Sequence, residues 1–169
     1  MPHPLVDQLR YTREQWSLGL EGLTEDDATR HFGQMNCISW IVGHLAAQEH
    51  RFWFEYAQGK APFPEPEQYA TGAPMSTPPL EETLGLWRKT VLAVDPYLDA
   101  LTTEMLERGV KNRQGTTTRL IGSLILRVTY HYWYHTGEIQ SIRQMLGHQD
   151  LPGFVGPIDS AAPYRPEAD

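Results

Sequence analysis

Two histidines, His131 and His135, lie four residues apart in a segment rich in aliphatic and aromatic residues, 124–146. On an α-helix, residues i and i+4 are about 40° apart around the axis, so both imidazoles leave the same face one turn apart. Leu124 and Val128 share that face, which predicts that it points into a core. Polar rings in a core need partners. A cation bound by both rings is one solution, and hydrogen bonds to the backbone or to each other are the alternative.

A third ligand has to come from elsewhere in the chain, and His44 is the best candidate. It borders the apolar stripe of another predicted helix, and the neighbouring Gly43 would let a second backbone approach closely. His50 is predicted on the polar side of the same helix. Of the remaining histidines, His3 is predicted in a frayed terminus and His148 directly after the last helix. His31 is not assigned to any predicted element.

Two charged residues lie close to the histidine face. Glu138 follows one turn after His135, where it could orient a ligand, act as a general base, bind the metal itself, or pair with Arg143 as a buried acid. Arg127 could bind an anionic group of a substrate or pair with Glu138. The single cysteine, Cys37, is interpreted as a small core residue, with a reactive thiol of lowered pKa as the alternative.

Four helices are expected to position these groups. The first runs from Pro4 to about Gly22, and the second from Cys37 or Ile38, capped by Asn36, to Gly59. A third begins at 77–81 and contains Pro96, which is expected to kink it or end it early. The fourth leads from Thr116–Thr118 to Gly147. Residues 102–117 are predicted as a loop or short hairpin, and Thr24 and Asp27 as a weak capping box.

The long connection between the second and third helices decides the topology. Residues 60–79 contain six prolines, which rule out a regular helix. We therefore predict an all-α fold, a four-helix bundle with a long Pro-rich crossover that lets helices two and three run parallel. Residues 1–149 would form the helical bundle metal-binding domain, and 150–169 an extended Pro-rich C-terminal tail packed on it.

Composition excludes several classes of protein. The 169 residues suit one domain, with 40% hydrophobic and 21% charged residues. A net charge of −7 without a basic cluster excludes nucleic acid as the main partner. One cysteine permits neither an internal disulfide nor a cysteine-based zinc site. Without an evident signal peptide or a membrane-length apolar run, the chain is predicted to be cytoplasmic with no membrane partner.

Two stretches resemble a known family. Residues 38–45, Ile-Ser-Trp-Ile-Val-Gly-His-Leu, and the pattern from His131 to Gly147 are similar to signatures of the DinB/YfiT-like family of metal-dependent enzymes, over most of residues 1–148. The resemblance implies a four-helix bundle, a homodimer, and a divalent metal held by His44, His131 and His135. It also implies zinc, with nickel or iron as alternatives. Characterised relatives include transferases and isomerases that use low-molecular-weight thiols.

These observations lead to one functional hypothesis and three alternatives. The hypothesis is a metal-dependent S-transferase that joins a low-molecular-weight thiol to a small electrophile, with Glu138 handling protons and Arg127 or Arg143 holding an anionic group. The alternatives are a metal-dependent hydrolase of a small ester or amide, a non-catalytic metal-binding or ligand-sensing bundle closed by a fourth ligand, and a dimeric scaffold without metal.

Overall fold

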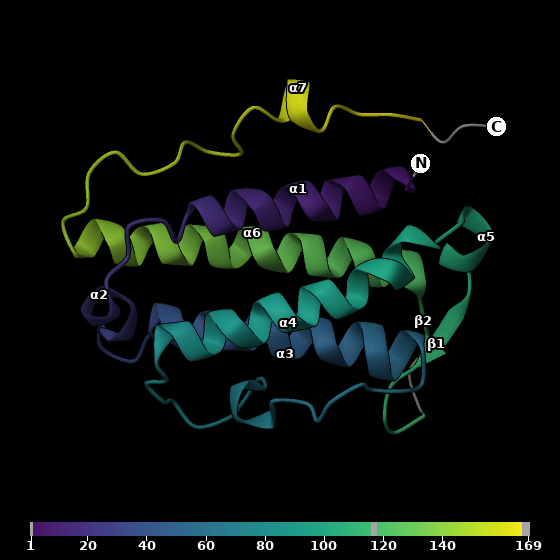
Figure 1. Ribbon diagram of the computed structural model, residues 1–169, viewed down its shortest axis with the longest axis horizontal. Coiled ribbons are helices and arrows are strands. Elements are labelled where there is room, and N and C mark those ends of the chain that lie inside the picture. The colour runs from purple at the N-terminus through teal and green to yellow at the C-terminus, as the bar shows by residue number, and fades with distance from the viewer. Residues whose placement is uncertain (1, 116–117, 167–169) are drawn as a thin grey trace.

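Four long helices form a bundle in the computed structural model, which describes residues 2–115 and 118–166 (Figure 1). They are α1 (Pro4–Leu18), α3 (Ile38–His50) with its π-helical continuation η1 (Arg51–Ala57), α4 (Leu80–Asp99) and α6 (Ile121–Met145). Short elements are α2 (Glu25–Thr29), η2 (Glu67–Tyr69), α5 (Thr103–Leu106), β1 (Gly109–Lys111), β2 (Thr118–Leu120) and α7 (Ile158–Ala161). The prediction of an all-α fold is confirmed.

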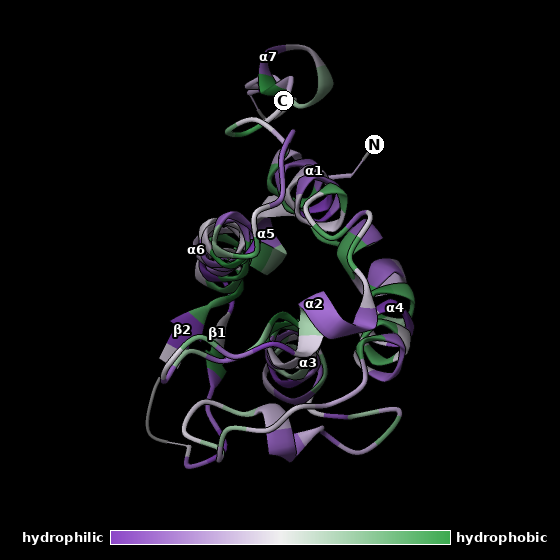
Figure 2. Cartoon of the chain, turned by 90° about the vertical axis from the view of Figure 1, so that its left-hand side faces the viewer, coloured by the Kyte–Doolittle hydropathy of each residue, from purple (hydrophilic) through white to green (hydrophobic). Residues whose placement is uncertain are grey.

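The crossover has the predicted effect on helix direction. The chain leaves η1, returns along the outside of α3 and enters α4 at the opposite end, so α3 and α4 run parallel (Figure 1). α1 and α6 run in the other direction. Seen end-on, α3 lies between α4 and α6, and α1 lies beside α6 (Figure 2). Strands β1 and β2 form an antiparallel hairpin with Val110 opposite Arg119. β1 lies in the region predicted as a loop or short hairpin, whereas β2 occupies residues 118–120, where the fourth helix was predicted to begin.

Local signals explain most element ends. The Thr24 side chain accepts from the Asp27 N–H while the Asp27 carboxylate accepts from the Thr24 N–H, so the capping box is complete. Gly59, with φ of 67°, follows η1 in the left-handed region that favours glycine. The fourth helix begins at Ile121, after β2; Thr116 and Thr117, which were expected to lead into it, lie outside the described residues.

The predicted N-cap of the second helix was wrong, and so was the early end expected at Pro96, whereas the alternative of a kink there stays a prediction. Cys37, not Asn36, is the N-cap of α3, and its side chain makes no capping bond. It is fully buried, which agrees with its interpretation as a core residue. α4 continues through Pro96 to Asp99. The carbonyl deprived of its bond belongs to Leu92, a residue that is 72% exposed, so water can take the place of the missing N–H.

A buried ion pair joins three of the long helices. Arg13 of α1 donates from Nε and Nη2 to the Glu49 carboxylate of α3, at 2.7 and 2.6 Å. The same carboxylate accepts from Trp53 Nε1 at 2.6 Å and from the Tyr132 hydroxyl at 2.9 Å. Glu49 is completely buried, so these four bonds replace its lost hydration.

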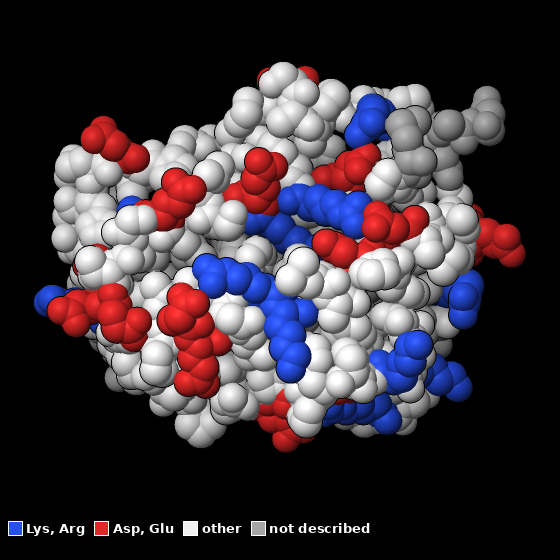
Figure 3. Space-filling model, viewed as in Figure 1, with Lys and Arg blue, Asp and Glu red and all other residues white. Residues whose placement is uncertain are grey.

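Outside the core, charges of both signs are interspersed. Arg10 pairs with Asp99 at 2.8 Å, and acidic and basic side chains lie side by side over α1 and α4 (Figure 3). The C-terminal segment follows α1, where the Tyr11 hydroxyl donates to the Val155 carbonyl at 2.5 Å. Across residues 2–115 and 118–166, none of the helices combines the length and apolar character of a membrane span.

Candidate metal centre

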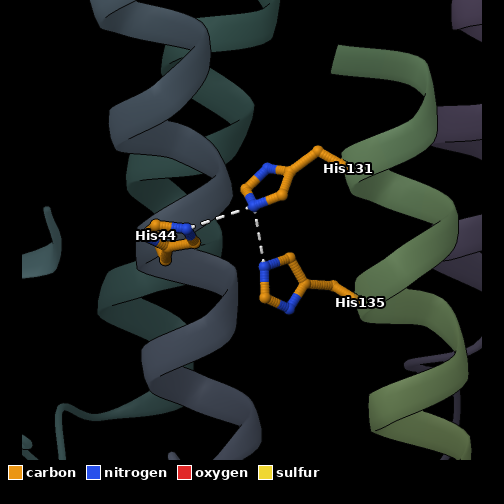
Figure 4. A group of neighbouring side chains, drawn as sticks. All are labelled: His44, His131 and His135. Atoms are coloured by element: carbon orange, nitrogen blue, oxygen red, sulfur yellow. Dashed lines mark hydrogen bonds between the residues drawn. The ribbon is translucent and has the colours of Figure 1, made fainter. Parts of the chain in front are cut away.

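Three histidine rings from two antiparallel helices meet inside the bundle. His44 projects from α3, and His131 and His135 project from α6 toward it (Figure 4). The Nε2 atoms of His44 and His131 are 3.2 Å apart, and those of His131 and His135 are 2.9 Å apart. Two nitrogens bound tetrahedrally to one zinc ion would be about 3.3 Å apart. The three residues form a group whose ligand atoms all lie within 4.8 Å of one another and could hold a metal ion.

The partners of two rings determine which nitrogen faces the centre. His44 Nδ1 lies 2.7 Å from the Tyr69 carbonyl oxygen, and His135 Nδ1 lies 2.7 Å from Glu138 Oε2. Both oxygens only accept, so each Nδ1 must carry the proton and each Nε2 presents a lone pair to the cluster. The one N–H of a neutral His131 can satisfy only one of these two lone pairs, and the buried Nδ1 of His131 has no hydrogen-bond partner among the described residues. A cation would satisfy all three Nε2 atoms, so the donor set fits a metal ion.

Burial keeps the rings in the form that binds metals. Burial, followed by the neighbouring His135, His44 and Arg127, lowers the pKa of His131 to about 3. Burial also lowers the pKa of His44, although the bond to the Tyr69 carbonyl partly opposes the shift. Both rings are therefore neutral at pH 7, as metal binding requires.

The position of His44 depends on a glycine. A Cβ added to Gly43 would lie 2.7 Å from the Tyr69 ring, so only glycine lets this ring pack against α3. The packed ring places the Tyr69 carbonyl beside His44 Nδ1. Trp40 stacks on the His44 imidazole, with ring centroids 5.0 Å apart and an 11° angle between planes. The sequence predicted a close approach at Gly43 but did not identify Tyr69 as the approaching residue.

The charged candidates take different places. Glu138 contacts His135, the arrangement in which a carboxylate orients a ligand. It does not pair with Arg143, whose Nη1 donates to the Gly19 carbonyl at 2.6 Å. No hydrogen bond or ion pair joins Glu138 to Arg127 among the described residues. Arg127 instead lines a cavity that also includes His44 and Arg119, a residue that the sequence did not single out.

The other histidines lie outside the cluster, and the prediction for His50 was wrong. His50 is completely buried, and its Nε2 bonds the Phe63 carbonyl at 2.7 Å because the crossover covers that side of α3. His31 lies between the Met35 carbonyl and the Thr77 hydroxyl. His148 lies 3.5 Å from Asp27. His3 accepts a hydrogen bond from the Leu5 N–H at the start of α1.

The fold and the cluster together define a helical bundle with a three-histidine site for a metal ion. The chain belongs to the DinB superfamily, whose family model matches residues 8–139 and so includes all three histidines. A search of curated proteins gave no match. The resemblance noted in the sequence is thereby confirmed at the level of the family.

Proposed function

We propose that this chain is a metal-dependent S-transferase that joins a low-molecular-weight thiol to a small electrophile. The observation that carries the proposal is the convergence of three Nε2 atoms, two of them held in the metal-binding tautomer by Tyr69 and Glu138. Three neutral nitrogen ligands leave a coordination position open, as in catalytic rather than structural zinc sites. Zinc is the metal we propose, and imidazole ligands also suit nickel and iron.

The histidines, Glu138 and Arg127 would have different roles around that ion. A divalent cation held by the three rings would lower the pKa of a bound thiol and supply thiolate at neutral pH. Glu138 fixes the orientation of His135 and can accept its Nδ1 proton, so it acts on the site through that ring. Arg127 lies one helical turn before His131, where it can position an anionic group of the substrate.

The geometry also bears on the alternatives. A closed, non-catalytic centre needs a fourth protein ligand, and within the described residues the group that could hold a metal contains only the three histidines. Glu138, the candidate for that place, is engaged with His135 Nδ1. These contacts favour an open site over a closed one, while hydrolysis of a small ester or amide remains an outcome that the test distinguishes.

The test begins with elemental analysis of untagged protein, followed by turnover of a panel of electrophiles with and without added thiol. We expect a near-stoichiometric metal, thiol-dependent turnover, and a changed absorption spectrum when thiol is added to the cobalt-substituted protein. His44→Ala, His131→Ala and His135→Ala should each abolish tight metal binding, and His148→Ala is the matched control outside the cluster. Turnover without thiol would support the hydrolase instead. Metal-loaded protein inert with every thiol and electrophile would refute the proposal.

A further inference from the structure

A cavity of about 210 Å³ opens beside the three-histidine cluster. Its lining includes Arg119 of β2, a strand that lies at one end of the bundle (Figure 1). The walls of the cavity come from α3, η1, the crossover, β2 and α6. His44 belongs both to the cavity lining and to the cluster. A molecule in the cavity therefore lies next to the position where the three Nε2 atoms converge.

The lining of this cavity is positively charged. Arg51, Arg119 and Arg127 contribute to it, and its described lining contains no carboxylate. Arg51 is neutralised because its guanidinium bonds Glu65. Arg119 and Arg127 have no hydrogen-bond or ion-pair partner for their side chains among the described residues. Two arginines without counter-charges at one cavity attract an anion, and a guanidinium matches a carboxylate or phosphate with paired N–H groups.

A neutral polar group lies in the same cavity. Gln48 Oε1 is buried and has no hydrogen-bond partner in the described part of the chain, although it belongs to the lining. A buried amide oxygen without a partner is costly. Because this oxygen has almost no accessible surface, the Gln48 side chain would have to turn toward the cavity before a ligand's hydroxyl or amide N–H could reach it. The apolar parts of Phe52 and Tyr56 complete the wall.

We propose that Arg119 and Arg127 bind the carboxylate or phosphate group of a small substrate whose reactive end faces the three histidines. Arg127 and His131 are four residues apart on α6, which corresponds to about 6 Å along the helix axis. The substrate class is thus a short molecule with a terminal anion at one end and a reacting atom at the other. The orientation of the reactive end rests on the proposed function, whereas anion binding by the two arginines does not.

Isothermal titration calorimetry of the 169-residue chain with inorganic phosphate and with succinate tests this proposal. The protein is measured as purified and after chelator treatment, since the ion itself could attract either probe. Succinamide is the neutral control. We expect both anions, and not succinamide, to bind the chelated protein, and the tighter of the two identifies the preferred headgroup. Arg119→Gln and Arg127→Gln should each weaken binding about 10-fold or more.

Matched variants separate recognition from folding. Arg127→Lys should recover part of the affinity, because it keeps the charge and loses the paired geometry. Arg108→Gln, an exposed arginine outside the cavity, should bind like wild type. Wild-type protein that binds neither anion, or Arg119→Gln and Arg127→Gln variants that bind as tightly as wild type, would overturn the proposal. Arginine-dependent anion binding without thiol-dependent turnover would leave it standing and refute the transferase. Thiol-dependent turnover that is unchanged in the Arg119→Gln and Arg127→Gln variants would refute the role of the two arginines in substrate binding and leave the transferase proposal standing.

Discussion

Replacement of Gly43 by alanine should impair metal binding, although no ligand is changed. The new Cβ would lie 2.7, 2.8 and 3.0 Å from three carbons of the buried Tyr69 ring. Ordinary carbon contacts begin near 3.4 Å, so the ring must retreat by about 0.7 Å. If the Tyr69 carbonyl moves with the ring, its 2.7 Å bond to His44 Nδ1 stretches to about 3.4 Å and is lost as a good hydrogen bond.

Two effects of this substitution oppose each other, and their sizes predict the outcome. Alanine in a helix interior gains about 1 kcal/mol over glycine, while overpacking costs about 1–3 kcal/mol. The net change in unfolding free energy is therefore small or destabilising. Loss of a bond that orients a metal ligand lowers metal affinity about 10- to 100-fold, or about 1.4–2.8 kcal/mol. We expect the affinity loss to exceed the change in stability.

Competition with a chelator of known affinity measures the effect, and urea unfolding of the metal-free protein measures stability. Gly85→Ala is the matched control, because Gly85 lies in α4 with nothing within 4 Å of the added Cβ. Tyr69→Ala removes the obstructing ring, so Gly43→Ala should cost much less affinity in that background. A Gly43→Ala protein that binds metal within threefold of wild type would refute this account of how His44 is held.

Three further predictions concern other contacts. Glu138→Ala should lower metal affinity about 10- to 100-fold by chelator competition, and Glu138→Gln by less, since its amide oxygen can still accept from His135 Nδ1. Glu49→Gln should lower the unfolding free energy in urea by up to about 3 kcal/mol, because Arg13 loses its buried counter-charge and keeps only the more exposed Asp95, 3.1 Å away; a loss below 1 kcal/mol would contradict this. The depressed pKa of His131, about 3 against about 6.5 unfolded, means that the unfolded state binds more protons between these values. Metal-free protein should therefore lose stability as pH falls below 6.5, by up to about 1 kcal/mol per unit after allowance for partial exposure, and His131→Gln should flatten that dependence in urea titrations at pH 7, 6 and 5.

The sequence was informative where structure follows local periodicity. His131 and His135 share a face because of helical spacing alone. The prolines of 60–79 predicted a long connection without a regular helix, and its length suggested a crossover with α3 and α4 parallel. His44 was reached from its place beside an apolar stripe and from the family motif. These predictions depend on neighbours in sequence or on one long connection, so no tertiary detail was needed.

The remaining parts of the site depend on contacts between distant segments. His50 was predicted to be exposed because it lies on the helix face opposite the apolar stripe. The crossover covers that face and buries His50, whose Nε2 bonds the Phe63 carbonyl. Tyr69 lies in that same irregular segment, whose path no periodicity describes, so its carbonyl could not be assigned to His44. Arg119 reaches the cavity through the hairpin register, which places it opposite Val110, and a three-residue strand leaves too little pattern to reveal this.

The histidine cluster also has a mechanical consequence for the whole bundle. His44 and His131 are separated by 87 positions along the chain and belong to different helices, so an ion shared by their rings would act as a removable cross-link between α3 and α6. Any cation bound only by the folded chain adds stability in proportion to the logarithm of its concentration, about 2.7 kcal/mol at 100 times its dissociation constant. The melting temperature of a preparation will consequently report its metal loading, and two batches of identical sequence can melt at different temperatures.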